Sequence, residues 1–291
     1  MIHIEGMGWF GAITALALER ANIAFTWSDN NSAHTAWKAS TGIVYPAGDD
    51  RTEANRQKWT RWVLDQWLPK DSAKLCQYVF AHKKPPHEGQ YPFAPYHDYH
   101  RASVAGVHAV CVDVQRIVTE ARSRFADRLL HVEPVDVPRI VAHGGPRAAA
   151  WVWGWSRKVH LETPPDSVRA AYYGKRHRFD LTYAYPVPDE DGWWYAGSAL
   201  VTERTQRVRS REELNTEWGR WMNSTAELFP YLRVMRTQPF VQGWRPKPKP
   251  GDKGLMTYED NVITFPALWH SGVRWAPQLV EQATSWAASF R

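Results

Sequence analysis

The N-terminus of the chain reads Met1-Ile-His-Ile-Glu-Gly-Met-Gly-Trp-Phe-Gly11. We expect a short strand over residues 1–4, then a glycine-rich turn, and then a helix over residues 12–20, whose apolar residues fall on one face. A second strand over residues 22–27 ends just before Asp29. The order of strand, glycine-rich turn, helix, strand and acidic residue is typical of a βαβ unit that binds a dinucleotide.

The glycines of this unit have separate physical reasons. Gly6 allows the tight turn, Gly8 lets the backbone approach a pyrophosphate, and Gly11 lets the helix pack closely on the strand. N–H groups at the start of the helix would meet the phosphate charge. Asp29, 18 residues after Gly11, can accept hydrogen bonds from both ribose hydroxyls of an adenosine. The alternative is a glycine turn that holds no ligand.

The composition of the 291-residue chain is that of a globular protein, with 44% hydrophobic and 23% charged residues. The sequence contains no run of 18 apolar residues and no secretory signal, so we expect no membrane contact and a cytoplasmic location. Cys76 and Cys111 can form at most one disulfide, which favours a reducing compartment. The histidines show no helical pair with metal-ligand spacing, so we expect no metal.

Basic charge is in excess, with a formal net charge of +6. This balance favours contact with polyanions or anionic substrates. Basic stretches at residues 175–178 and 207–211 could neutralise phosphates, or they could be solvated faces.

Tryptophan is also in excess, with 17 residues, and most of them are expected in the core. Trp151, Trp153 and Trp155 recur at every second position, which predicts one face of a β-sheet. Strand patterns without intervening helices at residues 178–186 and 193–200 indicate that this sheet is antiparallel. Three other tryptophans could stack on a splayed nucleobase: Trp244, Trp269 and Trp275.

Four further motifs follow the N-terminal unit. They are Ala39-Ser-Thr-Gly-Ile-Val-Tyr-Pro46, Ile140-Val-Ala-His-Gly144, Gly243-Trp-Arg-Pro246 and Ser271-Gly-Val-Arg-Trp-Ala-Pro277. Taken in order, these motifs resemble those of the D-amino-acid oxidase family of flavoenzymes, which includes glycine oxidase and sarcosine oxidase. The core motifs are also similar to those of the FAD domain of a bacterial tRNA wobble-uridine modifier.

The resemblance implies an α/β protein, α+β overall, in which a Rossmann-like FAD-binding domain is interleaved with an antiparallel-sheet substrate domain. It assigns residues 1–50, 101–155 and 240–291 to the FAD-binding domain. Residues 51–100 and 156–239 form the substrate domain in this division.

The resemblance also implies a noncovalent FAD, because Lys38 stands near the position where some relatives carry a histidine bonded to the flavin. The cofactor-binding residues it implies are Gly6, Gly8, Gly11, Asp29, Ser40, Thr41, Gly42, Gly144, Gly272, Val273 and Arg274. Glu5 departs from the family pattern, which has an apolar residue there. Its charge would repel a pyrophosphate unless the side chain turns away.

Three residues are implied at the catalytic site. In relatives that oxidise amino acids, the arginine that matches Arg245 grips the substrate carboxylate with two parallel hydrogen bonds. Tyr185 is similar to a tyrosine that helps to hold this carboxylate, although Tyr183 on the same strand could take the role. His270 lies beside the flavin-facing turn of the C-terminal motif.

We therefore expect FAD-dependent oxidation of an amine or amino acid, with hydrolysis of the imine and cleavage of the C–N bond. The substrate is a free small molecule or, as the alternative, a glycine-type group on a nucleobase of DNA or tRNA. Arg245 would hold a glycine carboxylate in either case. A scaffold without catalysis, or an NAD-dependent dehydrogenase, would leave the Gly-x-Arg-Pro motif without a role.

Overall fold

The structure is a computed structural model. It describes residues 1–30, 36–39, 42–44, 50–82, 96–98, 101–132, 134, 136–143, 150–162, 167–175, 178–203, 206–228, 233–247, 255–266 and 272–291.

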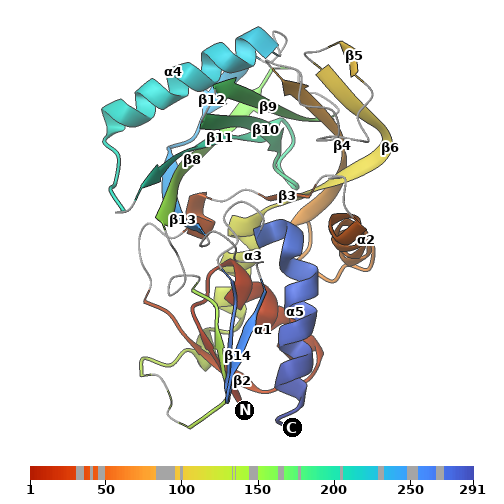
Figure 1. Cartoon of the computed structure of the whole chain (residues 1–291), viewed down its shortest axis with the longest axis vertical. Coiled ribbons are helices and arrows are strands. Elements are labelled where there is room, and N and C mark those ends of the chain that lie inside the picture. Colours follow the sequence, from red (N-terminus) through yellow and green to blue (C-terminus); the bar gives the residue numbers. More distant parts are fainter. Residues whose placement is uncertain are drawn as a thin grey trace.

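A five-stranded sheet forms the lower part of the molecule in Figure 1. In spatial order its strands are β14 (Thr257–Glu259), β15 (Val262–Thr264), β7 (Arg139–Val141), β1 (Ile2–Glu5) and β2 (Phe25–Ser28). All neighbours pair in parallel except β14, which is antiparallel to β15. Strand β1 lies between two parallel neighbours and is buried at all four positions, as expected for an inner strand of a parallel sheet.

A ten-stranded sheet forms the upper part of the molecule (Figure 1). Its main path runs through β12 (Val234–Thr237), β8 (Ala150–Leu161), β11 (Trp193–Glu203), β10 (Arg178–Pro186), β9 (Ser167–Lys175), β4 (Ala73–His82), β6 (Arg101–Val112) and β3 (Gly42–Val44). Strand β13 (Val241–Lys247) pairs with β8, and β5 (Tyr96–Asp98) pairs with β6. All pairs are antiparallel except β4 with β9.

The chain passes from the small sheet to the large one and back twice, since β7 lies between β6 and β8 in sequence and β14 follows β13. This order confirms the predicted α/β fold with an interleaved antiparallel sheet. Strands β6 and β13, which the sequence division assigns to the FAD-binding domain, pair within the large sheet. The division into domains stays a prediction.

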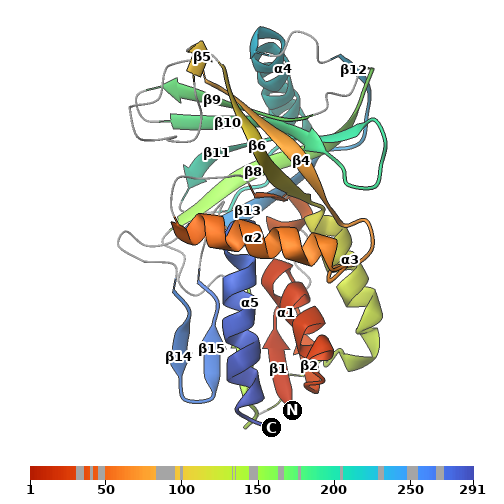
Figure 2. The same cartoon turned by 90° about the vertical axis from the view of Figure 1, so that its right-hand side faces the viewer.

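Helices α1 (Trp9–Arg20), α3 (Val114–Arg124) and α5 (Gly272–Ala288) pack beside the small sheet, and α1 contacts both of the others. Their buried residues form one core with the strands and include Ile4, Ile13, Ile117 and Leu279. Helix α2 (Asp50–Leu64) lies between α5 and the ends of β4 and β6 (Figure 2). Two short 3₁₀ helices are η1 (Ala36–Ala39) and η2 (Ala126–Arg128).

Helix α4 (Arg211–Leu228) covers the face of the large sheet that is turned away from the small sheet (Figure 1). Trp153 and Trp155 are almost fully buried in a second core with Leu214 and Trp221 of α4, and Trp151 packs against this core. The alternation of tryptophans on β8 therefore packs one sheet face, as predicted.

Candidate functional site

Two glycines of the N-terminal turn are required by the packing of the chain itself. Gly6 has φ +94°, a left-handed conformation that side chains rarely adopt, and an added Cβ would lie 3.1 Å from the Cβ of His143. A Cβ at Gly11 would lie 1.9 Å from the carbonyl oxygen of Gly6, which no side chain can do. The turn would therefore need these two glycines even without a ligand.

Gly8 differs, because nothing in the described part of the chain requires a glycine there. It caps α1 with φ −79°, and an added Cβ would make only an ordinary contact, 3.4 Å from Cδ1 of Trp37. No side chain caps the helix at this residue, and its first turn contains no acidic residue. A helix N-terminus of this kind attracts anions, and a glycine at this position leaves its backbone N–H groups uncovered by a side chain of its own.

Asp29 lies beside the glycine-rich turn, as the spacing predicted. Its Oδ2 accepts hydrogen bonds from the backbone N–H of Met7 at 3.2 Å and from Nη1 of Arg122 at 2.5 Å. The side chain of Asp29 is 9% exposed, so this carboxylate is held in place by partners on both sides. A fixed carboxylate at the end of β2 suits a ribose of an adenosine dinucleotide.

Arg122 is a residue that the sequence did not indicate. Its Nη1 also donates to the carbonyl oxygen of Met7 at 3.2 Å, and its guanidinium lies over the rings of Trp27 at 5.5 Å and Trp37 at 5.8 Å. Arg122 stands on α3, 93 residues after Asp29, so no local spacing could connect the two. It joins the glycine-rich turn, the end of β2 and η1.

The charge of Glu5 is paired within the chain. Its Oε1 accepts a hydrogen bond from Nη1 of Arg139 on β7 at 2.8 Å, and its Oε2 lies 4.0 Å from Nε2 of His143. Pairing with Arg139 therefore offsets the negative charge that Glu5 places beside the glycine-rich turn.

Two other predicted cofactor segments meet. A Cβ added to Gly42 on β3 would lie 3.1 Å from Cγ1 of Val273, so the start of α5 packs directly on β3. The indole of Trp59 donates to the carbonyl oxygen of Val273 at 2.8 Å. Gly272 and Arg274 lie in the first turn of α5. Ser40, Thr41, Gly144 and His270 lie outside the described residues.

Arg245 and Tyr185 stand on the same face of the large sheet. Arg245 pairs with Val152 of β8, and Tyr185 pairs with Tyr195, which pairs in turn with Lys158 of β8. Residues directly opposite in a sheet share a face, and so do residues an even number of positions apart in one strand. Trp153 and Trp155 point to α4, so Arg245 and Tyr185 belong to the opposite face.

This opposite face is the one turned toward the small sheet (Figure 1). The 3₁₀ helix η1 lies against β13 and β8. Arg245 is half-buried, and Tyr185 is 3% exposed. The fold thus brings the predicted carboxylate clamp toward the segment that carries Trp37, next to the glycine-rich turn.

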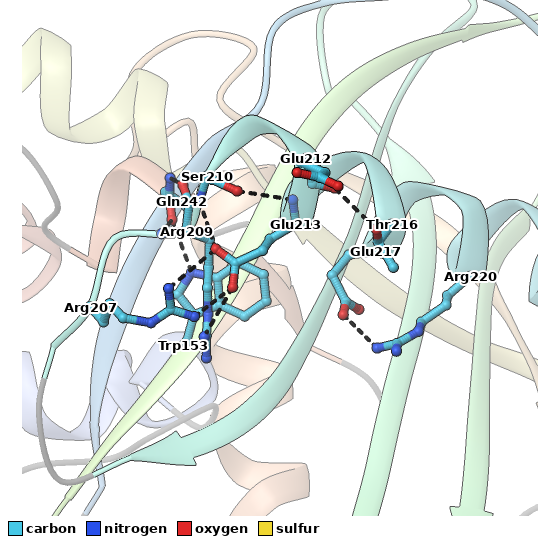
Figure 3. A network of polar contacts seen from close by, with 10 residues as sticks. All are labelled: Trp153, Arg207, Arg209, Ser210, Glu212, Glu213, Thr216, Glu217, Arg220 and Gln242. Carbon is cyan, nitrogen blue, oxygen red and sulfur yellow. Dashed lines mark hydrogen bonds and ion pairs between the residues drawn. The ribbon is translucent and has the colours of Figure 1, made fainter.

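The basic stretch at residues 207–211 is engaged within the chain (Figure 3). Arg207 pairs with Glu213 at 2.5 Å and Arg209 pairs with it at 3.6 Å. Ser210 and Glu213 also exchange hydrogen bonds as a capping box at the start of α4. These hydrogen bonds and cations lower the pKa of Glu213 from 4.5 to about 2. Residues of this basic stretch therefore form part of the N-terminal cap of α4.

The same network reaches the strand of Arg245 (Figure 3). The amide of Gln242 on β13 accepts from the backbone N–H of Arg209 at 2.9 Å and donates to its carbonyl oxygen at 3.0 Å. Trp153 donates to the same Gln242 oxygen at 3.1 Å. The segment before α4 therefore anchors β13 on the face that α4 covers.

The arrangement matches solved structures of flavin-dependent enzymes. Glycine oxidase from Bacillus cereus matches with a TM-score of 0.70 and 11% identity, over 100% of this chain and 95% of that chain. Glycine oxidase from Geobacillus kaustophilus gives 0.69 and 11%, over 99% and 94%. Iminodiacetate oxidase from Chelativorans sp. BNC1 gives 0.66 and 14%, over 99% and 95%.

At these identities the likeness shows the fold, and at that level the resemblance predicted from the motifs is confirmed. No protein-family model matches the chain, and no curated protein matches its sequence. Among the helices of the described ranges, none has the length and apolarity needed to cross a bilayer. Within the same ranges, histidine, cysteine and acidic side chains form no group of three or more that could hold a metal ion.

Proposed function

We propose that the chain binds FAD noncovalently and uses it to oxidise a small amine or amino acid that carries a carboxylate. One observation carries the proposal: Gly8 leaves the N-terminus of α1 open to a phosphate, beside the fixed carboxylate of Asp29. The fold around it is shared, over nearly the whole chain, with proteins named glycine oxidase and iminodiacetate oxidase.

The cofactor fits the residues that are present. The backbone at the start of α1 would bind the pyrophosphate, and Asp29 would accept hydrogen bonds from the ribose. The junction of Gly42 with Val273, at the N-terminus of α5, would border the flavin ring. The other residues assigned to this cofactor site are Gly6, Gly11, Ser40, Thr41, Gly144, Gly272 and Arg274.

Bound FAD would accept a hydride from the carbon that bears the amine, and water would then hydrolyse the imine to a carbonyl compound and a free amine. The protein binds and orients the substrate. Arg245 grips its carboxylate through two parallel hydrogen bonds, which fixes the direction of the C–H bond. Tyr185, on the same sheet face, supports the carboxylate, and His270 is assigned to the same site.

We place the substrate among free small molecules rather than groups linked to a nucleic acid. Arg207 and Arg209 share the carboxylate of Glu213, so this basic stretch offers less charge to phosphates than its sequence suggested. Trp244 is 3% exposed and belongs to the core under α4, where it cannot stack on a base.

Substitution of Arg245 tests the function. The FAD-reconstituted Arg245→Met variant should keep its flavin, while an amino acid that reduces wild-type flavin should reduce it at least about a hundredfold less efficiently, since a charged bidentate contact is lost. Arg245→Lys should recover part of the loss, because lysine restores the positive charge but not the two parallel hydrogen bonds of the guanidinium. If Arg245→Met is reduced with the kinetics of wild type, Arg245 does not bind the substrate carboxylate.

Salt dependence tests the substrate class. Reduction by a free amino acid should change little between about 50 and 200 mM salt, whereas a substrate linked to DNA or tRNA should lose orders of magnitude in affinity over this range. Bleaching only by a glycyl-substituted oligonucleotide, with a steep loss on added salt, would establish the nucleic-acid alternative instead.

A further inference from the structure

Helix α5 contains a proline close to its start. The helix begins at Gly272, and Pro277 lies within it. A proline has no N–H group, so the carbonyl oxygen of Val273, four residues earlier, lacks the donor that a regular helix would give it. A backbone carbonyl that loses its helical donor inside a fold needs a partner from another element.

Helix α2 supplies this partner. The indole Nε1 of Trp59 donates to the carbonyl oxygen of Val273 at 2.8 Å. The side-chain oxygen of Asn55 accepts a hydrogen bond from the backbone N–H of Gln278 at 3.1 Å. Asn55 and Trp59 stand four residues apart on one face of α2, and both are buried. Helix α2 therefore bonds to the backbone of α5 on both sides of the proline.

The ring of Trp59 also lies against the start of α1. It stacks on the ring of Trp9, with the ring centroids 6.1 Å apart and an angle of 11° between the planes. Trp9 is the first residue of α1 and directly follows Gly8. Figure 2 shows α2 lying across the ends at which α1 and α5 begin. One side chain thus contacts both helix starts.

Packing explains the ring of Trp59 but not its nitrogen. A phenylalanine at position 59 would fill most of the same space and could still stack on Trp9. The indole N–H adds a hydrogen bond to a backbone that the proline leaves incomplete. This bond fixes the first turn of α5 on the same ring against which α1 begins.

We propose that Trp59, together with Asn55, is a positioning residue that sets the first turn of α5 relative to the first turn of α1. The inference rests on the proposed function, in which α1 binds the pyrophosphate of FAD and the start of α5 borders the flavin ring. The two helix starts would bind different parts of one molecule, so their relative position has to match that molecule before it binds.

Two probes of different length test the positioning role. FAD spans both helix starts, whereas ADP can occupy only the start of α1 and the ribose site beside it. Trp59→Phe should weaken binding of FAD to the apoprotein about tenfold, because the carbonyl of Val273 loses its donor. It should leave the binding constant of ADP, measured by competition with FAD, within about twofold. Asn55→Leu should affect FAD more than ADP in the same way.

A second substitution supplies the missing donor from α5 itself. Pro277→Ala introduces an N–H group that can donate to the carbonyl of Val273, as in a regular helix. In this background Trp59→Phe should weaken FAD binding by less than about threefold. A role for Trp59 in packing alone would not respond to a change at position 277.

Lys58→Met is the matched control, because Lys58 joins the same two helices through a partly exposed ion pair with Glu281. Glu281 lies on α5 beyond its first turn. Lys58→Met should leave the binding constants of FAD and ADP within about twofold of wild type, since such an ion pair contributes little. Thermal unfolding of this variant and of Trp59→Phe shows whether each is folded at the temperature of the titration.

The outcomes separate this inference from the proposed function. Trp59→Phe that binds FAD as wild type does, or that loses FAD and ADP equally, overturns the positioning role. An unchanged loss in the Pro277→Ala background, or a wild-type protein that binds FAD without competition from ADP, overturns it as well. If Trp59→Phe does not fold, Asn55→Leu is judged by the same criteria. A wild-type protein that takes up no FAD overturns the proposed function and this inference with it.

Discussion

The two sheets treat their buried polar side chains differently. In the small sheet the ring of His3 lies 3.0 Å from the hydroxyls of both Thr26 and Ser28, and Glu5 pairs with Arg139. In the large sheet the hydroxyl of Ser156 is buried without a partner in the described structure. The small sheet pairs these polar side chains within the chain, whereas the large sheet buries the Ser156 hydroxyl without such a partner in the described structure. Internal polar pairing is therefore a feature of the small sheet, on which the glycine-rich turn depends.

The largest expected effect comes from the glycines of the small sheet. Gly11→Ala should destabilise the protein by about 3 kcal/mol or more, because its Cβ would overlap the Gly6 carbonyl at 1.9 Å. Thermal unfolding should show a midpoint lower by roughly 10 °C. An unchanged midpoint would mean that the helix does not pack on the turn as described.

Gly8→Ala is the matched substitution. It should cost at most about 1 kcal/mol of stability, since its Cβ meets only Trp37 at 3.4 Å, but it should weaken FAD binding about tenfold or more. Equilibrium titration with FAD measures this. Wild-type affinity for FAD in Gly8→Ala would contradict the phosphate site at α1.

Arg139→Met tests the internal pairing of the small sheet. It should destabilise the protein by about 2 kcal/mol, because Glu5 would keep a largely buried charge without its hydrogen-bonded partner. Chemical denaturation gives the loss, and the double variant Arg139→Met with Glu5→Gln should recover part of it. If both variants are as stable as wild type, the pair contributes nothing.

Substitutions of Asp29 and Arg122 test whether the carboxylate beside the glycine-rich turn contributes to FAD binding. Asp29→Ala should weaken FAD binding about tenfold through loss of the ribose contacts. Arg122→Gln should weaken it less, because the carboxylate remains but is no longer held by Nη1. FAD retention after gel filtration and titration of the apoprotein measure both effects. Full flavin retention in Asp29→Ala would show that the fingerprint is assigned wrongly.

The smallest effect concerns the start of α4. The pKa of Glu213 is lowered in the folded state from 4.5 to about 2, so its contribution to stability is complete above pH 4.5 and is lost as the pH falls toward 2. Glu213→Gln should therefore remove a small part of the stability loss between these pH values and leave FAD binding unchanged. Identical acid denaturation curves for the variant and wild type would mean that the pairing with Arg207 contributes nothing to stability.

The sequence predicted the parts of the fold that depend on neighbouring residues. The βαβ unit, the position of Asp29 and the tryptophan face of β8 all follow from local spacing. Helix α1 begins at Trp9, earlier than the expected residue 12, because Gly8 takes the capping position. Local patterns were sufficient where the relevant contacts are local.

Contacts between distant segments could not be read in the same way. Arg122 reaches Asp29 only because α3 packs beside α1. Ser156 shares a face with Arg245 only because β8 pairs with β13 in one particular register, and a shift of one residue would move Ser156 to the other face. Neither side chain belongs to a motif, so only the assembled sheet and helices show where they lie.

The most direct measurement of the central claim is the absorbance of the FAD-reconstituted wild-type protein during anaerobic titration with free amino acids. The account predicts that the protein takes up one FAD and that glycine, iminodiacetate or a related small amino acid bleaches the oxidised flavin. A protein that remains colourless after incubation with FAD, or a bound flavin that no free amine reduces, would contradict it.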